Sequence, residues 1–551
     1  MRRRNFALPF IALAIGAMPW PEALANPTGP TSVRGVASIS GLGSSSVTVN
    51  TNNAKAIINW QGFSIGGGEI TRFTQPSAAS AVLNRVTSTQ ASSILGALQS
   101  NGQVFLINPN GIFFGGGATV DVAGLVASSL NLANDDFISG RLRFTETPGA
   151  GQVVTSGLTR APVEFGGGPG TVINAPGGFV YLVASSINHG GDINATEVVL
   201  AAAKSIEIMN PATPDVTVKI SAEPGNTLRD FGAIRGERIN MFAGVLDISG
   251  GGPFGSAAIV SASTATAGAD GTVILRATGD INVGPEGGFF SDGPRIEASK
   301  RVQMIAGGNI TMSCSECRTD APALVQGGDI FLKGNNMTQG ENASLLGRRL
   351  TIASVGDVDL GNFSNSVARF GGRASGDVVF NNTSPTLKVT GLTVEPPHSL
   401  SLTQHGDLKI KGDVISGPQT ISATGKVLVT PGRTGGIIVF AAGPQSIESG
   451  GDMTIQGGRS RDASALVSSS DNTDLTVGGT LRLNSGSVPQ GWARVQTLDR
   501  DSIITLHFPN LSSGGWLVNG SAGAIRQGQS GFLSGNGAAV LGRTLIVDYG
   551  P

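Results

Sequence analysis

The feature that most constrains the fold is a short unit, Gly then Asp or Asn then an aliphatic residue, which recurs from residue 191 onward. It occurs as Gly191-Asp192-Ile193, Gly279-Asp280-Ile281, Gly308-Asn309-Ile310, Gly328-Asp329-Ile330, Gly356-Asp357-Val358, Gly376-Asp377-Val378, Gly406-Asp407-Leu408 and Gly451-Asp452-Met453. Gly can supply positive φ at a corner, and Asp or Asn can hydrogen-bond its own backbone two residues on. The spacing is irregular but typical of a solenoid built from one or two coils of roughly twenty-odd residues.

Between these corners the sequence favours short strands. Val273 and Leu275 share one face of a segment, and Ile281 and Val283 share one face of the next. Gly is frequent, with 82 in 551 residues, and 40% of the chain is hydrophobic with few aromatics, which suits a narrow core of small side chains. Even strand spacing allows a series of sandwiches or a coiled parallel sheet. Recurrent corners, in place of hairpin dipeptides, predict an all-β, right-handed parallel β-helix in which Asn or Asp ladders at the corners.

The charge balance excludes some function classes. The chain has 37 basic and 38 acidic residues, so it lacks the excess of positive charge that is typical of nucleic-acid-binding proteins. Four histidines (His189, His398, His405 and His507) and two cysteines make a metal or nucleophile site improbable on composition. We therefore predict no catalytic residue, no metal and no cofactor.

The first 25 residues have the pattern of a signal peptide. Arg2, Arg3 and Arg4 form a positive start, Phe6 to Met18 is apolar, and Ala23-Leu24-Ala25 gives a small-x-small cleavage site. Cleavage between Ala25 and Asn26 is expected. No later stretch is long and apolar enough to predict a transmembrane helix. The chain is expected to enter the periplasm and to need a separate conduit beyond it.

The ends of a β-helix need caps, because exposed strand edges aggregate. The stretch 26–75 with Trp60 and the last sixty residues with Trp492 and Trp516 are the candidate caps, and no tryptophan lies between residues 60 and 492. We expect residues 271–485 to form a stem of β-helical repeats. Residues 486–551 are expected to form a C-terminal cap or a small terminal module.

A set of ordered motifs lies between residues 57 and 132. They are Ile57-Ile58-Asn59-Trp60, Phe73-Thr74-Gln75-Pro76, Leu83-Asn84-Arg85-Val86, Ile107-Asn108-Pro109-Asn110-Gly111-Ile112 and Gly124-Leu125-Val126-Ala127-Ser128-Ser129-Leu130. In this order along the sequence they closely resemble the N-terminal secretion domain of the filamentous haemagglutinin family, the exported partners of two-partner secretion systems. The resemblance covers roughly residues 26–270. It implies secretion to the cell surface or medium through a partner outer-membrane transporter with periplasmic polypeptide-binding domains. The family's second Asn-Pro-Asn-Leu motif is absent, since Asn210-Pro211 continues as Ala-Thr.

Asn108-Pro109-Asn110-Gly111 suits a type I turn, because Pro fixes φ at the second position and Gly follows at the fourth. It lies between the apolar runs 104–107 and 112–114 and so turns one strand into the next. Two interpretations stay open: the motif builds the start of the β-helix, or the transporter recognises it during export.

Cys314-Ser315-Glu316-Cys317 holds the only two cysteines. Behind a signal peptide this spacing favours a tight loop disulfide between Cys314 and Cys317. Free thiols and a chemical role are the alternatives, but zinc would need two further ligands and no histidine lies close in sequence.

Three functions fit a secreted β-helix. The first is a binding exoprotein, an adhesin or haemagglutinin-like factor whose host-cell or matrix ligand the sequence does not identify. The second is a polysaccharide-active enzyme, which would need carboxylates or a basic residue converging on one face. Here the Asp residues lie mostly at Gly-Asp corners, where turn formation explains them. The third is a shortened stem that delivers a toxin or ligand-binding module.

Overall fold

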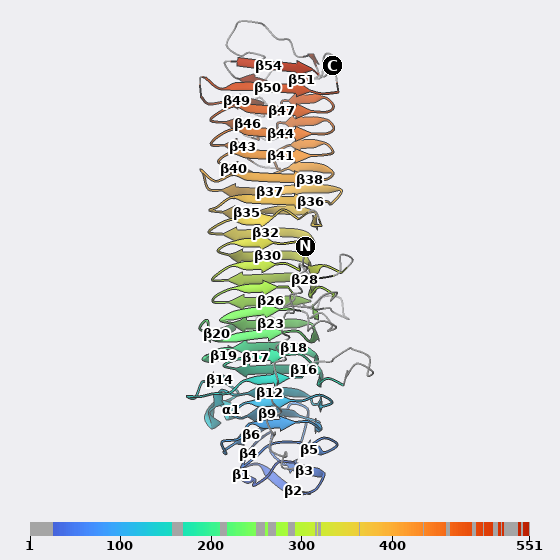
Figure 1. The fold of residues 1–551 in the computed structure, drawn as a ribbon, viewed down its shortest axis with the longest axis vertical. Coiled ribbons are helices and arrows are strands. Elements are labelled where there is room, and N and C mark those ends of the chain that lie inside the picture. The colour runs from blue at the N-terminus through green and yellow to red at the C-terminus, as the bar shows by residue number, and fades with distance from the viewer. Residues whose placement is uncertain are drawn as a thin grey trace, which may run out of the picture.

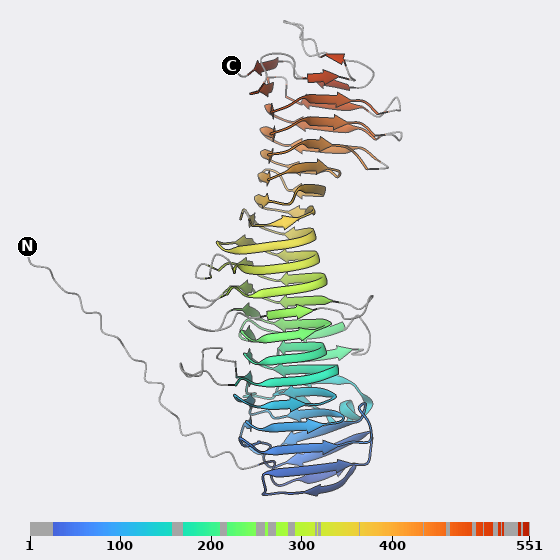
Figure 2. The same cartoon turned by 90° about the vertical axis from the view of Figure 1, so that its right-hand side faces the viewer.

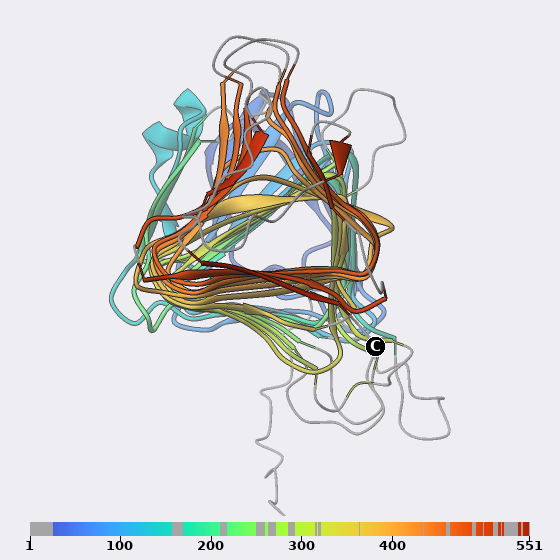
Figure 3. The same ribbon diagram turned by 90° about the horizontal axis from the view of Figure 1, so that it is seen from above.

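Short strands in each coil of the chain pair in parallel with the strands one coil earlier and one coil later. Leu400 pairs with Gln419, for example, and Gln419 with Gln445. A computed structural model describes residues 26–156, 169–209, 217–249, 259–262, 271–284, 292–314, 317, 321–362, 364–432, 435–458, 463–486, 492–499, 501–510, 516–518, 521–522, 538–541 and 544–549. The coils stack into a rod (Figures 1 and 2) with a triangular cross-section (Figure 3). The predicted all-β parallel β-helix is confirmed.

One side of the rod is a stack of 17 strands that pair in parallel. In spatial order along the rod they are β7 (Ser92–Ile94), β10 (Ile112–Phe114), β15 (Val153–Thr155), β17 (Ile187–His189), β21 (Thr227–Asp230), β24 (Val245–Ile248), β27 (Ile281–Val283), β29 (Ile310–Met312), β31 (Met337–Gln339), β33 (Val358–Leu360), β36 (Val378–Asn382), β38 (Leu400–Gln404), β41 (Gln419–Ala423), β44 (Gln445–Ser449), β47 (Thr473–Val477), β50 (Ile503–Phe508) and β54 (Thr544–Tyr549).

The other two sides share 33 strands in one connected sheet. The first strands of this sheet, to residue 202, are β1 (Thr31–Arg34), β2 (Val36–Ser40), β3 (Ser46–Thr51), β4 (Lys55–Trp60), β5 (Ile70–Thr74), β6 (Ala81–Val86), β8 (Ala97–Ser100), β9 (Gln103–Ile107), β11 (Thr119–Asp121), β12 (Gly124–Ser128), β16 (Val172–Ala184) and β18 (Asp192–Ala202). Those from residue 233 to 394 are β22 (Ala233–Gly236), β23 (Arg238–Ala243), β25 (Ile259–Ala262), β26 (Thr272–Ala277), β28 (Arg295–Ala306), β30 (Ala323–Gly334), β32 (Ala343–Ser354), β34 (Ser366–Val367), β35 (Arg369–Ala374) and β37 (Thr386–Val394). The remainder are β39 (Asp407–Ile410), β40 (Val414–Ser416), β42 (Val427–Val429), β43 (Ile437–Ala441), β45 (Met453–Gln456), β46 (Ala465–Ser469), β48 (Leu481–Asn484), β49 (Ala493–Thr497), β51 (Trp516–Val518), β52 (Ser521–Ala522) and β53 (Ala538–Leu541).

A smaller antiparallel sheet and a helix lie outside the coils. The sheet consists of β13 (Asn131–Leu132), β14 (Leu142–Thr145), β19 (Ser205–Met209) and β20 (Thr217–Ser221), and the helix is α1 (Asn134–Ser139). Figure 1 shows both at the edge of the lower third of the rod. Within the described ranges, α1 is the only helix.

Aliphatic side chains stack in register inside the coils. Ile281, Ile310, Met337, Val358 and Val378 occupy one position in five successive coils, and each is buried. Because strand side chains alternate, every second residue reaches this interior, and burying each contributes about 1.5–3 kcal/mol before chain entropy is counted. The interior is therefore one continuous core along the rod.

The Gly-Asp corners work differently from the sequence expectation. Asp357 Oδ1 accepts the backbone N–H of Asp377 at 2.9 Å, and Asp377 Oδ1 accepts that of Ser399 at 2.7 Å. Each carboxylate thus binds the next coil, and not its own backbone two residues on. Gly376 does not have the positive φ that was expected, whereas Gly406 at a later corner does, with φ of +144°. A Cβ at Gly376 would clash with Asp357 Oδ1 and with the Gly356 carbonyl carbon. The expected corner ladder is present, and glycine is needed because the carboxylate from the coil below passes where a side chain would begin.

These hydrogen bonds at the corners lower the pKa of two aspartates. The backbone N–H of Ser399, followed by its hydroxyl, lowers the pKa of Asp377, and the N–H of Thr480, followed by Arg482, lowers the pKa of Asp452. A carboxyl whose pKa is lowered by folding stabilises the fold above its ordinary pKa. That contribution is lost as the pH falls through the lowered value.

Amide side chains pair inside the coils at a few positions. Gln339 Nε2 donates to Asn365 Oδ1 at 2.7 Å and Asn365 Nδ2 returns a bond to Gln339 Oε1 at 2.8 Å. Asn382 donates to Gln404 Oε1 at 2.7 Å in the same way. All four side chains are buried. These bonds satisfy polar groups in an apolar interior and fix the register of neighbouring coils.

The first coil is closed by antiparallel strands. β1 pairs antiparallel with β4, and β2 pairs antiparallel with β3, whereas the sheet continues from β3 and β4 in parallel. These strands lie across the bottom of the rod in Figure 1. They cover an edge that a second chain could otherwise extend.

At the far end the described strands continue the coils. β54 stacks in parallel on β50, β53 on β49 and β51 on β48, while β52 turns back antiparallel on β51. The described part of residues 486–551 therefore belongs to the same rod.

Candidate functional site

Strands near the start of the rod are buried on both faces. In β12 all five residues are buried, and Leu125 and Ala127 point into the coil while Val126 points outward. The outward side chains form a second core with α1 and the antiparallel sheet, which contribute Phe137, Phe144 and other apolar residues. This outer core spans residues 57–242 and has no counterpart among the described residues of the later coils. It distinguishes the region where the sequence motifs lie.

Two cations hold α1 against the coils. Arg85 donates to Asn134 Oδ1 at 2.8 Å and to the Leu132 carbonyl at 2.6 Å. Lys55 donates to the Phe137 carbonyl at 2.6 Å, and its ammonium lies 5.4 Å from the centre of the Phe137 ring. Burial lowers the pKa of both cations. Arg85 of the Leu83–Val86 motif is thus a structural residue of the outer layer.

Two further motifs supply buried side chains to the first coils. Trp60 is fully buried, and its indole Nε1 donates to Asn84 Oδ1 at 2.9 Å. Phe63 packs edge-on to Trp60 with ring centres 5.7 Å apart. Gln75 is buried and donates to Ser100 Oγ at 2.9 Å and to the Gln103 carbonyl at 3.0 Å. Residues of the ordered motifs therefore make contacts between neighbouring coils.

Asn108-Pro109-Asn110-Gly111 forms the predicted turn between β9 and β10. The Gly111 N–H donates to the Asn108 carbonyl at 3.0 Å, and the Asn110 N–H donates to Asn108 Oδ1 at 3.0 Å. Gly111 has φ of +107°, which favours glycine. Pro109 reaches the next coil, since its carbonyl accepts the Gly151 N–H at 2.7 Å.

Both asparagine side chains of the turn bind the preceding coil. Asn108 is fully buried and its amide donates to the Gln90 carbonyl and to Ser92 Oγ, each at 2.9 Å. Asn110 donates to the Ser88 carbonyl at 2.8 Å. The part of the motif that reaches the surface is Pro109 and Asn110, which are half-buried.

A buried polar chain lies beneath the outer layer. Tyr181 Oη donates to Glu197 Oε1 at 2.5 Å, and Arg238 Nη2 donates to Glu197 Oε2 at 2.8 Å. Burial, then the charge and hydrogen bond of Glu197, raise the pKa of Tyr181. A cavity of about 390 Å³ opens beside these residues, with Phe105 and Phe137 among its apolar walls. The sequence analysis did not identify this group, because its members come from three separate strands.

His189 and Asp230 also form a pair that the sequence did not reveal. His189 Nδ1 lies 2.7 Å from Asp230 Oδ1, and both side chains are fully buried inside the coils. They stack on Thr155 through the register of β15, β17 and β21.

In the described part of the chain no group of three or more His, Cys, Asp or Glu could hold a metal ion. Among these same residues, no helix is long and apolar enough to cross a membrane.

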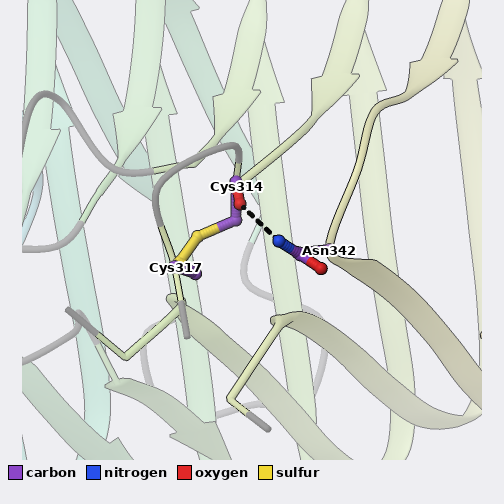
Figure 4. The surroundings of a disulfide bond; sticks show 3 residues. All are labelled: Cys314, Cys317 and Asn342. Carbon is purple, nitrogen blue, oxygen red and sulfur yellow. Dashed lines mark hydrogen bonds between the residues drawn. A yellow bond between two sulfur atoms is a disulfide. The ribbon is translucent and has the colours of Figure 1, made fainter. Parts of the chain in front are cut away.

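Cys314 and Cys317 are joined by a disulfide, with Cα atoms 5.2 Å apart (Figure 4). Both side chains belong to the interior core. Asn342 from the next coil donates to the Cys314 carbonyl at 3.3 Å. The pair therefore lies at a junction between coils, with residues 315 and 316 outside the described range.

Reducing this disulfide is expected to lower the free energy of unfolding by at most about 2 kcal/mol. So short a loop removes little entropy from the unfolded chain, and both sulfurs stay buried after reduction. Thermal unfolding with and without dithiothreitol measures the effect, and a Cys314→Ala/Cys317→Ala variant should not respond to the reductant. A loss above about 3 kcal/mol would show that the bond does more than close a loop.

Asn26, the first described residue, is bound within the N-terminal cap. Its backbone N–H donates to Glu69 Oε2 at 2.9 Å, and the Gly66 N–H donates to the same oxygen at 2.8 Å. Its side chain donates to the Ser44 carbonyl at 2.6 Å and accepts from Thr71 Oγ1 at 2.8 Å. Asn26 is 1% exposed. Ala25 and the rest of residues 1–25 lie outside the described residues, as do Asn210 and Pro211.

Comparisons with known proteins agree with the motif assignment. A family profile described as the TPS secretion domain matches residues 24–283. Two heme/hemopexin-binding proteins of Haemophilus influenzae are similar. One is 32% identical over 178 residues, which is 31% of this chain and 18% of that protein. The other is 38% identical over 112 residues, which is 20% and 12% respectively. Each match thus covers less than a fifth of the relative's length.

Among solved structures, the HMW1 secretion domain from Haemophilus influenzae aligns with 95% of this chain and 100% of its own, at 18% identity and a TM-score of 0.40. Exoproteins with a TPS secretion domain pass through the periplasm and leave the cell through a partner outer-membrane transporter. The profile match and the ordered motifs show that this chain carries a TPS secretion domain at residues 24–283.

Proposed function

We propose that this exoprotein acts by binding, as a surface-displayed adhesin or haemagglutinin-like factor. The observation that carries the proposal is the continuous rod beyond the secretion domain. From β27 at residue 281 to β54 at residue 549, each strand of the 17-strand stack pairs with the one before it. The described strands of this segment thus form a long continuous surface beyond the secretion domain. The similar Haemophilus proteins are also named as binding proteins.

The test is adherence of a surface-displaying strain. Bacteria that express the full chain with its partner transporter should bind host epithelial cells, and bacteria with the transporter deleted should not. Purified secreted protein should compete for the same attachment. Exported protein that neither binds cells nor competes would contradict the proposal.

The names of the similar proteins suggest a second ligand class. Haem and haemopexin can be offered to the purified mature chain, with the Soret band and surface plasmon resonance as readouts. Saturable binding of either, without adherence to cells, would replace adhesion by haem acquisition.

We propose residues 271–485 as the stem, and the described strands of 486–551 as its final coils. The profile match extends to residue 283, slightly beyond the expected end at 270. Because β26 and β27 pair with strands on both sides, the secretion domain and the stem share one core. The stem is therefore rigidly continued from the export domain.

We also propose that Asn26 is the mature N-terminus. Cleavage after Ala25 would turn its nitrogen into an ammonium, which would form an ion pair with Glu69. Glu69→Gln should then cost about 1.5–3 kcal/mol in local opening of the first coils, since a charge-assisted bond is lost. Hydrogen exchange of residues 55–74 measures this, and the exposed Glu448→Gln is the control. Mass spectrometry of secreted protein beginning more than a few residues from Asn26, or unchanged exchange, would contradict the assignment.

A further inference from the structure

Four successive coils of the stem carry a cation at the same outward position. Arg369 pairs in register with Lys388, and Lys388 pairs with Lys409. One coil earlier, Leu350 pairs in register with Phe370. Arg349 and Arg369 directly precede these two residues, so they occupy the same position in their coils. Adjacent strands of a sheet are about 4.8 Å apart, so these residues form a straight column of positive charge.

The column lacks the acidic partners that other cations of the rod have. Arg238 pairs with Glu197 at 2.8 Å and Arg482 with Asp452 at 2.7 Å, each across neighbouring coils. Within the described ranges, no carboxylate forms an ion pair with the four column residues or with Lys411. Asp329, which is in register with Arg349 on the preceding coil, forms its ion pair with Arg348 at 3.2 Å.

This arrangement costs stability, because like charges directly opposite each other on a sheet repel. Lys388 shows the strain: burial lowers its pKa, and the charges of Lys411 and Arg369 lower it further. A β-helix can place an acid or a neutral residue at such a position without changing its core. The column therefore fits a binding surface better than a structural feature.

A groove of about 970 Å³ continues from the column towards the far end of the rod. Lys388 and Lys411 line its start. Thr390, on the same strand as Lys388, also lies at its start, and Thr430, Gln456 and several glycines line it further on. These hydroxyl and amide groups can donate and accept hydrogen bonds. The groove is thus long, polar and positively charged at one end.

The lining distinguishes between classes of anionic partner. Proteins that bind single-stranded nucleic acid stack bases on aromatic side chains, and the described lining of this groove contains none. A membrane surface favours an exposed apolar face flanked by cations, whereas this site is hollowed and polar. A linear acidic sugar chain has hydroxyls for the threonines and glutamine and anionic groups for the lysines. Its monosaccharide repeat is also comparable in length to one coil spacing.

We propose that the cation column and this groove bind an acidic polysaccharide. Its sulfate or carboxylate groups would lie on the column residues Arg349, Arg369, Lys388 and Lys409 and on Lys411 at the start of the groove. Its ring hydroxyls would bond to Thr390, Thr430 and Gln456. The proposal rests on the binding function proposed above and names the chemical class of one ligand. It assigns the site to the stem, apart from the secretion domain.

The test uses the full secreted chain and surface plasmon resonance on immobilised dextran sulfate and hyaluronan, with neutral dextran as the blank. Lys388→Gln/Lys411→Gln should weaken binding to the acidic chains by at least about five-fold, by loss of two exposed ion pairs. Arg348→Gln/Lys426→Gln removes the same charge from the same region, at cations that lie near Asp329 and Asp452, and should change binding by less than two-fold. Lys388→Arg/Lys411→Arg keeps the charge and should restore binding.

Circular dichroism and thermal unfolding check that each variant folds. The Gln pair removes a repulsion and is expected to be at least as stable as the natural chain. Equal losses in both Gln pairs, or no binding of either acidic polysaccharide, would overturn the proposal. Tighter binding to duplex DNA of matched charge would overturn it in favour of nucleic acid. If the natural chain adheres to host cells but binds neither polysaccharide, the ligand class falls and the adhesin function stands; loss of adherence to cells is the separate failure of that function.

Discussion

Replacing Asn108 and Asn110 together with alanine is expected to reduce secretion steeply and to destabilise the first coils by about 3 kcal/mol. The turn chemistry alone predicts a smaller loss of about 1–2 kcal/mol. The larger value follows from burial, because the change leaves Ser92 Oγ and the Gln90 carbonyl without the Asn108 amide. Secretion is measured with the partner transporter, and stability by hydrogen exchange of the purified mature chain.

Pro109→Ala separates recognition from folding. Pro109 is half-buried, and its contact with Gly151 uses the backbone carbonyl, which alanine keeps. If the Pro109→Ala variant folds normally but is not secreted, the transporter recognises the surface of the turn. If only the asparagine variant fails, in folding and secretion alike, the motif is structural. Normal secretion of the asparagine variant would exclude both roles in export.

Trp60→Ala should be the most destabilising single change in the N-terminal region, with a loss of about 3–5 kcal/mol. It opens a cavity beside Phe63 and leaves Asn84 Oδ1 without the indole N–H. Trp60→Phe fills most of the volume but still leaves Asn84 Oδ1 without its donor, so we expect a smaller loss than for alanine. Hydrogen exchange of residues 55–107 reports the effect.

Trp492 provides the matched control. It is partly exposed and contacts the Arg494 guanidinium, 4.4 Å from its ring. Trp492→Ala should therefore cost about 1 kcal/mol or less. Equal losses at the two tryptophans would show that Trp60 is not a core residue of the first coil.

The fold was predictable because it repeats. Alternation such as Ile281 and Val283, with Gly-Asp at the corners, gives both the strands and the turns of a coil. The partner of each corner was not predictable. Local chemistry suggests that Asp377 binds its own backbone, but a neighbouring coil brings Ser399 equally close, and irregular coil lengths hide that pairing in the sequence.

In the candidate site, too, the local turn could be predicted from the sequence and the contacts between coils could not. The turn at Asn108 followed from residue preferences over four positions, whereas its partner Ser92 lies in the preceding coil. The outer layer was missed because a run such as Leu125-Val126-Ala127 is apolar on both faces without showing what covers the outer one. Phe137 on α1 covers that side, and a helix of six residues leaves little periodic signal.

The backbone hydrogen bonds of a parallel β-helix run between coils, along the length of the rod, and this determines how the molecule responds to force. A load spread over the outer surface is shared by all bonds between two coils, so the rod resists stretching as a unit. A load applied along the chain at one end of such a stack acts on the outermost coil alone. That coil would detach before the next is loaded, so the stack would unwind one coil at a time from the loaded end. A tether that yields in this way lengthens under tension while the coils nearest the secretion domain stay folded.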